Sequence, residues 1–176
     1  MATSSDTQQL VVLVSGGGPV GLTFSLNLAM MMGKHVKIII YEGRWFVDEN
    51  GNTKWQDEEQ GKTRRDQVVT LQDHVIEQMP TYIQKGLFKN FDERVWPTSR
   101  NIPIREVEDR LFELIQPFVS SGQIELVAEQ LQEQTERFVK GRCLYLLIIH
   151  RKYFFYRRLR CIGWNRWFKF VCSSIL

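Results

Sequence analysis

Near its start the chain reads Val11-Val12-Leu13-Val14-Ser15-Gly16-Gly17-Gly18-Pro19-Val20-Gly21-Leu22, a β-branched run that leads into a group of glycines. This pattern predicts a strand at Leu10–Val14, a tight turn at Gly16 and a helix that begins at the turn. Gly18 would let the backbone approach a pyrophosphate closely, and Gly21 would let the helix pack against the strand. The N–H groups and the positive end of the helix would then face the phosphates, so the motif predicts a dinucleotide-binding turn. The alternative is a glycine-rich turn that binds no ligand.

The residues after the glycines complete a strand–helix–strand unit. A helix is predicted at Leu22–Met32, where apolar residues recur every three or four positions, with Gly33 as its C-cap. The nearly continuous apolar run Val36–Tyr41 predicts a central parallel strand. It is followed by Glu42, roughly 20 residues past the last glycine, as the dinucleotide fingerprint requires. A carboxylate here could accept hydrogen bonds from both ribose hydroxyls and would repel a 2′-phosphate, which favours FAD or NAD over NADP. The alternative is a solvated acid at a strand end.

Charge divides the chain into two unlike parts. Residues 1–140 contain fifteen Lys and Arg against twenty Asp and Glu, a net charge of −5, whereas residues 141–176 contain eight bases and no acid. We expect a disordered N-terminus at 1–8, a partial dinucleotide-binding domain at 9–140, and an atypical basic, aromatic tail at 141–176. The fold class expected is α/β, with a Rossmann-like, mostly parallel sheet that is incomplete.

Other features argue against metal, disulfide and membrane chemistry. The three cysteines all lie in the tail, with a spacing that fits neither a metal site nor a disulfide framework, and the three histidines are far apart in sequence. The first seven residues have no signal-peptide pattern, and the apolar run at 143–149 is too short to span a bilayer. We therefore expect a cytoplasmic location and no metal.

The middle of the chain predicts further elements of the same fold. Residues 43–67 form a polar connection in which Asn50-Gly51 favours a hairpin with a type I′ turn. A short β-like segment follows at 68–71, and then a mainly helical stretch broken by Pro80. A helix is predicted at Glu106–Phe118, followed by another strand of the sheet at Ile124–Glu129.

Taken together, these motifs resemble the N-terminal FAD-binding part of flavoprotein aromatic hydroxylases of the para-hydroxybenzoate hydroxylase type, over roughly residues 9–130. The motifs are the glycine run from Gly16 to Leu22, the E-x-R pair Glu42 and Arg44, the basic pair Arg64-Arg65 before Val68, and Ile104-Arg105 at a helix start. There is some likeness to the kynurenine-hydroxylase and actin-oxidising branches.

The resemblance implies FAD as the cofactor. It implies that the glycines hold the pyrophosphate, that the acid binds the adenosine ribose, and that the arginines meet the adenosine and phosphates or line the flavin. In this comparison the proline after the second motif glycine and the E-x-R pair favour FAD over NAD. The cofactor-binding residues expected are Gly16, Gly18, Pro19, Gly21, Glu42, Arg44, Arg64, Arg65 and Arg105.

The chain also departs from the family pattern. Ser15 and Gly17 stand where the family usually has glycine and alanine, and the stretch from Gly21 to Glu42 is a residue or two longer than usual. The later aspartate-glycine and glycine-aspartate motifs and the substrate domain are missing. The resemblance therefore implies an FAD-binding module of a monooxygenase-like oxidoreductase that is inactive alone, with no catalytic residue identified, and NAD(P)H as reductant only in a full-length relative.

One hypothesis explains the tail. If the codon of Arg142 ends in GA, a one-base shift reads Asp across Arg142 and Cys143, so residues from about 141 onward would be an out-of-frame or intron-derived ending. The gene sequence tests this. Two other functions remain open: an NAD-dependent dehydrogenase fragment that uses the same glycine turn, and a non-enzymatic tail that binds an anionic membrane surface or single-stranded nucleic acid through its basic and aromatic residues.

Overall fold

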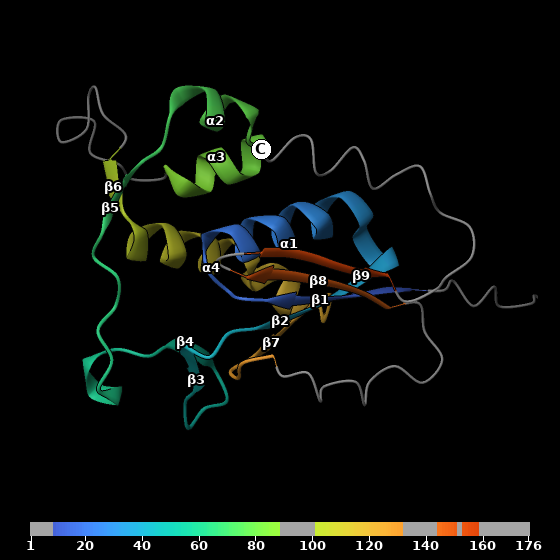
Figure 1. Ribbon diagram of the computed structural model, residues 1–176, viewed down its shortest axis with the longest axis horizontal. Coiled ribbons are helices and arrows are strands. Elements are labelled where there is room, and N and C mark those ends of the chain that lie inside the picture. Colours follow the sequence, from blue (N-terminus) through green and yellow to red (C-terminus); the bar gives the residue numbers. More distant parts are fainter. Residues whose placement is uncertain (1–8, 89–100, 132–143, 151–152, 159–176) are drawn as a thin grey trace, which may run out of the picture.

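The computed structural model describes residues 9–88, 101–131, 144–150 and 153–158. Its centre is a five-stranded sheet in the order β7-β2-β1-β8-β9 (Figure 1). Parallel pairing joins the first four strands of that order, and β9 runs antiparallel to β8. The strands are β1 (Leu10–Ser15), β2 (Val36–Tyr41), β7 (Ile124–Val127), β8 (Leu144–His150) and β9 (Tyr153–Arg158). The last two come from the segment that the sequence separates as a tail, and the structure places them in the sheet.

The three strands predicted for the main sheet within the first 140 residues are confirmed, although β7 ends at Val127, two residues before the predicted end at Glu129. β1 and β2 pair in register from Leu10 opposite Val36 to Ser15 opposite Tyr41. Their apolar runs supply much of the core, because side chains of both strands are almost completely shielded from solvent. A continuous β-branched run suits a strand that has neighbours on both edges.

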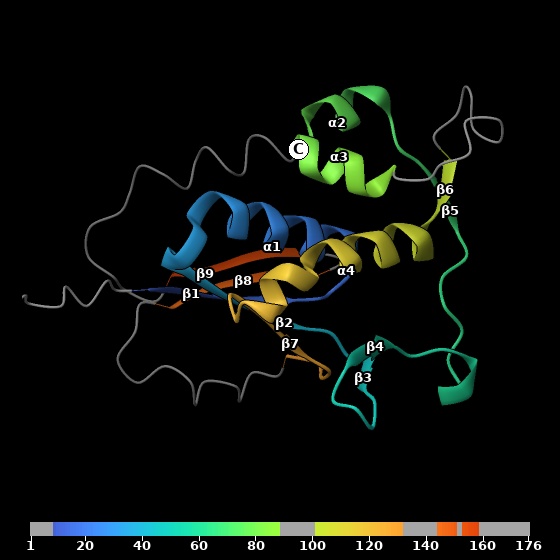
Figure 2. The same ribbon diagram turned by 180° about the vertical axis from the view of Figure 1, so that it is seen from behind.

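Two helices cover one face of the sheet, as Figures 1 and 2 show from opposite sides. They are α1 (Pro19–Met32), which ends in the short 3-10 turn η1 (Gly33–His35), and α4 (Ile104–Ser120). Both predicted helices are confirmed, and α4 extends two residues beyond the prediction at each end. α4 turns Val107, Leu111 and Ile115 towards the core, at the spacing of an amphipathic helix.

The predicted hairpin is present, but the prediction of its turn is wrong. β3 (Trp45–Val47) pairs antiparallel with β4 (Thr53–Trp55), and the pair Val47–Thr53 leaves five residues, 48–52, in the loop instead of a two-residue type I′ turn. The Asp48 carboxylate organises this loop: it accepts hydrogen bonds from the backbone N–H groups of Asn50 and Asn52, at 3.0 and 2.8 Å. A carboxylate that satisfies two loop amides makes the longer connection favourable.

The remaining elements lie over and beside α4. β5 (Val68–Thr70) and β6 (Asn101–Pro103) form a separate two-stranded sheet, and the 3-10 turn η2 (Glu58–Gln60) precedes it. α2 (Asp73–Gln78) and α3 (Thr81–Leu87) are separated at Met79 and Pro80, as the proline predicts, and α3 packs on α4. In the described part of the chain, no helix has the length and apolar character to cross a membrane.

Candidate functional site

The glycine turn and Glu42 lie side by side at the carboxyl edge of the parallel strands. The turn follows β1, and Glu42 follows the neighbouring β2, so parallel pairing brings the two together. The Gly16 N–H donates to the Tyr41 carbonyl at 2.7 Å, and the Gly17 N–H donates to Glu42 Oε2 at 2.9 Å. The structure therefore unites the two parts of the predicted motif, which are 25 residues apart in the case of Gly17 and Glu42.

Three glycines of the turn are required by the protein's own packing. Gly16 has φ +107°, a conformation that residues with a side chain rarely adopt. A Cβ on Gly17 would overlap the indole ring of Trp45, and a Cβ on Gly21 would lie 1.9 Å from the Gly16 carbonyl oxygen. These contacts explain the glycine at each of these positions without reference to a ligand.

Gly18 differs from the other three. Its backbone has φ −72° and ψ −175°, an extended conformation that any residue adopts. A Cβ there would meet nothing closer than 3.5 Å, its nearest neighbours being Arg44 Nη2 at 3.5 Å, Arg65 Nη2 at 3.8 Å and Glu108 Oε1 at 3.8 Å. Neither strain nor packing within the described residues therefore requires a glycine at this position.

The start of α1 lies at the same place. Gly18 is its N-cap residue, Pro19 is the first helical residue, and the Leu22 N–H donates to the Gly18 carbonyl at 2.9 Å. Proline suits this position because its fixed φ is already helical and no intrahelical bond is lost. Among the described residues no side chain caps the helix, so the positive end of its dipole can attract an anion beside Gly18.

The carboxylate of Glu42 already accepts four hydrogen bonds. Oε2 accepts from the Gly17 N–H and from Arg44 Nη2 at 2.8 Å, and Oε1 accepts from the Arg44 N–H at 3.1 Å and from Arg44 Nε at 3.0 Å. Burial opposes the ionised form, but these bonds and the Arg44 charge prevail and lower the pKa of Glu42 from its ordinary 4.5. Since a carboxylate has about four acceptor positions, ribose hydroxyls could bind Glu42 only if they replace the hydrogen bonds from the Arg44 side chain.

Arg44 joins this acid to a second one. Its Nη1 donates to Glu108 Oε1 at 2.9 Å, while Nε and Nη2 face Glu42, and its guanidinium lies 4.8 Å from the centre of the Trp55 ring. Burial would lower the pKa of Arg44, but the hydrogen bonds to Glu42 and Glu108 and their charges raise it above its usual value. Arg44 is therefore a fixed cation that bridges β2 and α4.

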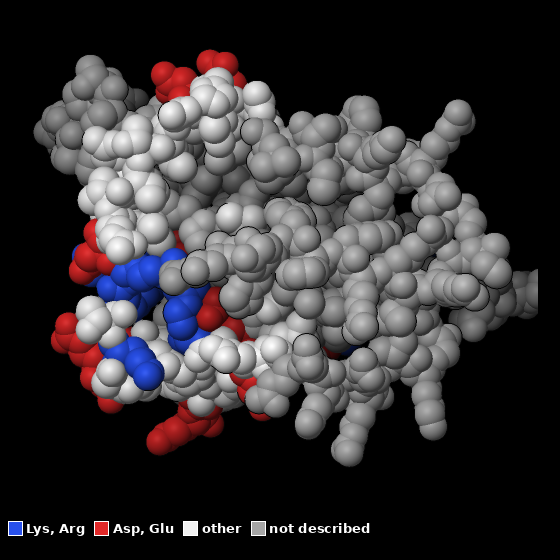
Figure 3. Space-filling view, viewed as in Figure 1, with Lys and Arg blue, Asp and Glu red and all other residues white. Residues whose placement is uncertain are grey.

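Arg64 and Arg65 approach the same buried acid. Arg65 Nη2 lies 3.0 Å from Glu108 Oε1, and Arg64 Nη2 lies 3.6 Å from Glu108 Oε2. Arg64 also contacts Asp109 at 2.6 Å, and its guanidinium lies 5.0 Å from the centre of the Trp55 ring, which it shares with Arg44. Figure 3 shows basic side chains gathered at this end of the molecule with acidic side chains beside them.

Aromatic rings support the arginines from behind. Trp55 contacts Trp45 and Phe112 edge-on or tilted, at centroid separations of 5.6 and 6.0 Å, and Trp45 contacts Phe112 at 5.5 Å. Trp45 also fills the space above Gly17. The hairpin is therefore part of the site, because its two tryptophans pack under the glycine turn and under the guanidinium groups.

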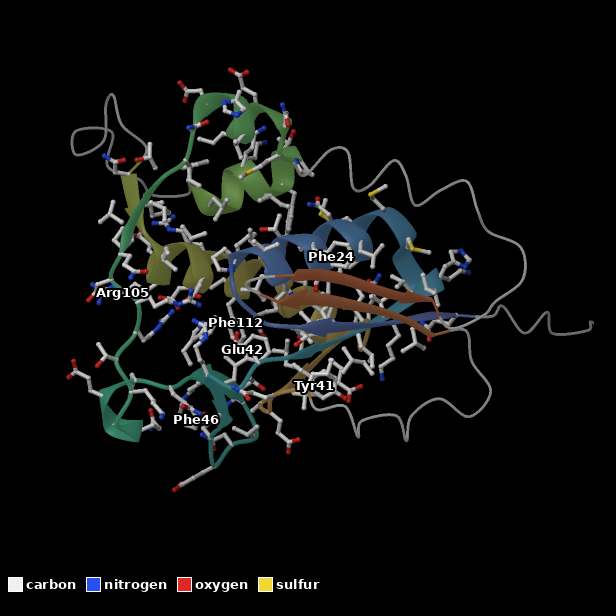
Figure 4. All side chains as sticks on the ribbon, in the orientation of Figure 1. Phe24, Tyr41, Glu42, Phe46, Arg105 and Phe112 are labelled. Carbon is white, nitrogen blue, oxygen red and sulfur yellow. The ribbon has the colours of Figure 1, made fainter. Side chains whose placement is uncertain are left out.

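Arg105 is not brought to this cluster. Figure 4 shows it at the outer end of α4, well separated from Glu42. Its Nε lies 2.9 Å from Asp66 Oδ1, and its side chain is half exposed. It borders an open hollow of about 360 Å³ that is lined only by polar and charged residues. The lining residues are Asp57, Glu58, Glu59, Lys62, Thr63, Arg64, Asp66 and Arg105.

Sequence reasoning identified the three clustered arginines and overlooked Glu108. The signal was available: Glu108 stands three residues before Leu111 and seven before Ile115, on the apolar face of α4, and it is only 1% exposed. An acid in a row of core residues needs partners. Among the described residues, no three His, Cys, Asp or Glu side chains lie together as metal ligands would.

Several predicted features fall outside the described ranges: the N-terminus at 1–8 and, in the basic aromatic tail, residues 141–143, 151–152 and 159–176. A comparison of the chain with protein-family models and with curated proteins finds no match, so the residues and their geometry alone support what the site binds.

Proposed function

We propose that the chain binds an adenine dinucleotide, specifically FAD, with the diphosphate at Gly18 and the start of α1. The observation that carries the proposal is that nothing among the described residues requires a glycine at position 18. The protein uses the missing side chains of Gly16, Gly17 and Gly21 for its own turn and packing, but not that of Gly18. A ligand that approaches the backbone closely at this point would explain why residue 18 is a glycine.

The order of the strands supports a Rossmann-like site. The four parallel strands follow one another along the chain as β1, β2, β7 and β8, and they lie in the sheet in the order β7-β2-β1-β8. This corresponds to the order 3-2-1-4 of dinucleotide-binding sheets. In such sheets ligands bind beyond the carboxyl ends of the strands, where the order reverses beside the first strand. Gly18 and the start of α1 occupy this position.

Glu42 supports a ribose site next to the diphosphate. Its carboxylate lies within hydrogen-bonding distance of the Gly17 N–H, at the end of the second strand. Two of its four hydrogen bonds come from the Arg44 side chain, and exchange of these two for ribose hydroxyls would keep the acid fully bonded. The acid disfavours a 2′-phosphate, so NADP is the least suitable of the dinucleotides.

FAD, when bound, would supply the redox chemistry of a monooxygenase-like oxidoreductase. The residues described here bind and orient: the helix start and the arginines neutralise the diphosphate, and the two tryptophans of the hairpin hold the arginines in place. We propose no proton donor or acceptor for a reaction, and the chain would act as the cofactor-binding part of a larger catalytic unit.

Titration of the purified chain with FAD, followed by flavin absorbance and fluorescence, tests the proposal. We expect saturable binding that Gly18→Ala weakens at least about tenfold, or about 1.4 kcal/mol, without loss of the fold. Val20→Ala is a matched control, because Val20 is an exposed residue of the same helix start.

Three outcomes would contradict this assignment. Binding of NAD with no binding of FAD would favour the dehydrogenase alternative at the same turn. If neither dinucleotide binds, the glycine turn serves the fold alone. If Gly18→Ala binds FAD as well as the wild type, the diphosphate does not bind at Gly18.

A further inference from the structure

Glu108 is a buried carboxylate surrounded by three guanidinium groups. It is 1% exposed, and its oxygens lie 2.9 Å from Arg44, 3.0 Å from Arg65 and 3.6 Å from Arg64. The arginines come from two separate segments, and α4 supplies the acid. A buried charge with good partners is retained in a protein at a cost, so its placement calls for a reason beyond stability.

The geometry at Glu108 brings two like charges together. A single oxygen, Oε1, accepts from both Arg44 Nη1 and Arg65 Nη2. Without a shared anion, two guanidinium groups would repel each other and separate. Glu108 therefore fixes the distance between the two cations as well as neutralising part of their charge.

Both cations lie beside Gly18. Arg44 Nη2 and Arg65 Nη2 lie 3.5 and 3.8 Å from the position that a Cβ of Gly18 would occupy. Among the described residues, Arg44 uses three of its N–H donors, from Nε, Nη1 and Nη2, so it can bind a phosphate oxygen and still hold Glu108. Paired guanidinium groups match the oxygens of a diphosphate better than those of a neutral sugar.

We propose that Glu108 is a positioning residue for diphosphate recognition: it holds Arg44 and Arg65 together at Gly18, where the diphosphate of the dinucleotide binds. This inference rests on the proposed function and adds a buried acid that acts through the two arginines, although its own Oε1 lies 3.8 Å from the position that a Cβ of Gly18 would occupy. The ligand class is an adenosine diphosphate moiety, either free or as part of a dinucleotide.

The test compares ADP with adenosine, which differ only in the diphosphate. Their dissociation constants are measured on the full chain by competition with FAD. The dissociation constant of adenosine divided by that of ADP, which is the ratio of ADP affinity to adenosine affinity, gives the contribution of the diphosphate. We expect Glu108→Gln to lower this ratio at least about tenfold while the affinity for adenosine changes less than about twofold. If the role of Glu108 is purely structural, Glu108→Gln will weaken the binding of ADP and of adenosine alike and leave the ratio unchanged. That result would overturn the proposal.

Glu106→Gln is the matched control. Glu106 lies in the first turn of the same helix and pairs with Arg110 at 2.7 Å, and its side chain is partly exposed, so its variant should keep the wild-type ratio. Inorganic pyrophosphate alone, as a competitor of FAD, separates recognition of the bare anion from recognition of the dinucleotide; we expect it to compete more weakly than ADP.

A second variant keeps the inference testable if Glu108→Gln does not fold. Arg65→Lys retains a cation beside Glu108 but removes the planar fork, and it should also lower the ratio of ADP to adenosine affinity. An unchanged ratio in Arg65→Lys would likewise overturn the inference. If the wild-type chain binds neither FAD nor ADP, the proposed function fails and the inference with it; if it binds both and neither variant alters the ratio, the inference alone fails.

Discussion

Gly21→Ala is expected to destabilise the protein by about 2 kcal/mol, although alanine is the better helix former. Gly21 lies inside α1, where propensity alone would favour alanine by about 1 kcal/mol. The added Cβ would stand 1.9 Å from the Gly16 carbonyl oxygen, whereas real Cβ atoms stay at least 3.0 Å from other atoms, so helix and turn must separate by roughly 1.1 Å (3.0 − 1.9). Both sides of this contact are backbone, so the cost lies at the upper end of the usual overpacking range, about 3 kcal/mol. Subtraction of the propensity gain leaves about 2 kcal/mol.

Thermal unfolding followed by circular dichroism measures this loss. For a chain of this size, about 2 kcal/mol corresponds to a Tm lower by about 4–8 °C. Gly86→Ala is the matched control: the three atoms nearest to a Cβ at Gly86, in α3, all belong to the side chain of Leu114, which can move more readily than backbone, so the loss should be smaller. A Gly21→Ala protein as stable as the wild type, or more stable, would refute the close approach of α1 to the glycine turn and the packing argument based on it.

Three further predictions concern single side chains. The pKa of Glu42 lies below its ordinary 4.5, so its ionised form stabilises the fold above about pH 4.5, and this contribution is lost as the pH falls through the lowered pKa. The difference in free energy of unfolding between wild type and Glu42→Gln, measured in urea, should therefore shrink as the pH falls over that range. A difference that stays constant would contradict the network with Arg44. The hydrogen bond from Lys54, followed by those from the loop amides, lowers the pKa of Asp48 from 3.8 to about 2, so the advantage of wild type over Asp48→Asn should hold above pH 4 and disappear towards pH 2 in the same assay. Ile115→Ala removes a fully buried side chain of α4 and should lower the free energy of unfolding in urea by about 2–5 kcal/mol; a loss below about 1 kcal/mol would contradict its place in the core.

The local elements of the fold follow from the sequence. A β-branched run, a residue with positive φ and an apolar repeat every three or four positions act over a few residues, so β1, the turn at Gly16 and α1 can be predicted from their own segment. The pairing of the turn with Glu42 also follows, because parallel strands joined by one helix end at the same edge of the sheet. The five-residue loop at Asp48 could not be predicted from the turn preference of Asn50-Gly51, because the Asp48 carboxylate accepts hydrogen bonds from two backbone N–H groups of the loop and so favours the longer connection.

Only the tertiary structure decided how the charges are arranged. Glu108 is 64 residues from Arg44 and 43 from Arg65, and no local pattern links such positions. Their meeting depends on how α4 crosses the sheet, which is set by the packing of its whole apolar face. The same packing places Arg105 at the outer end of the helix, beside Asp66 and away from the glycine turn. The sequence by itself determined a strand–glycine turn–helix unit with an acid at its edge. The buried anion shared by the arginines, and their position beside Gly18, arise from long-range packing, because electrostatic partners are selected by proximity in space and not by spacing along the chain.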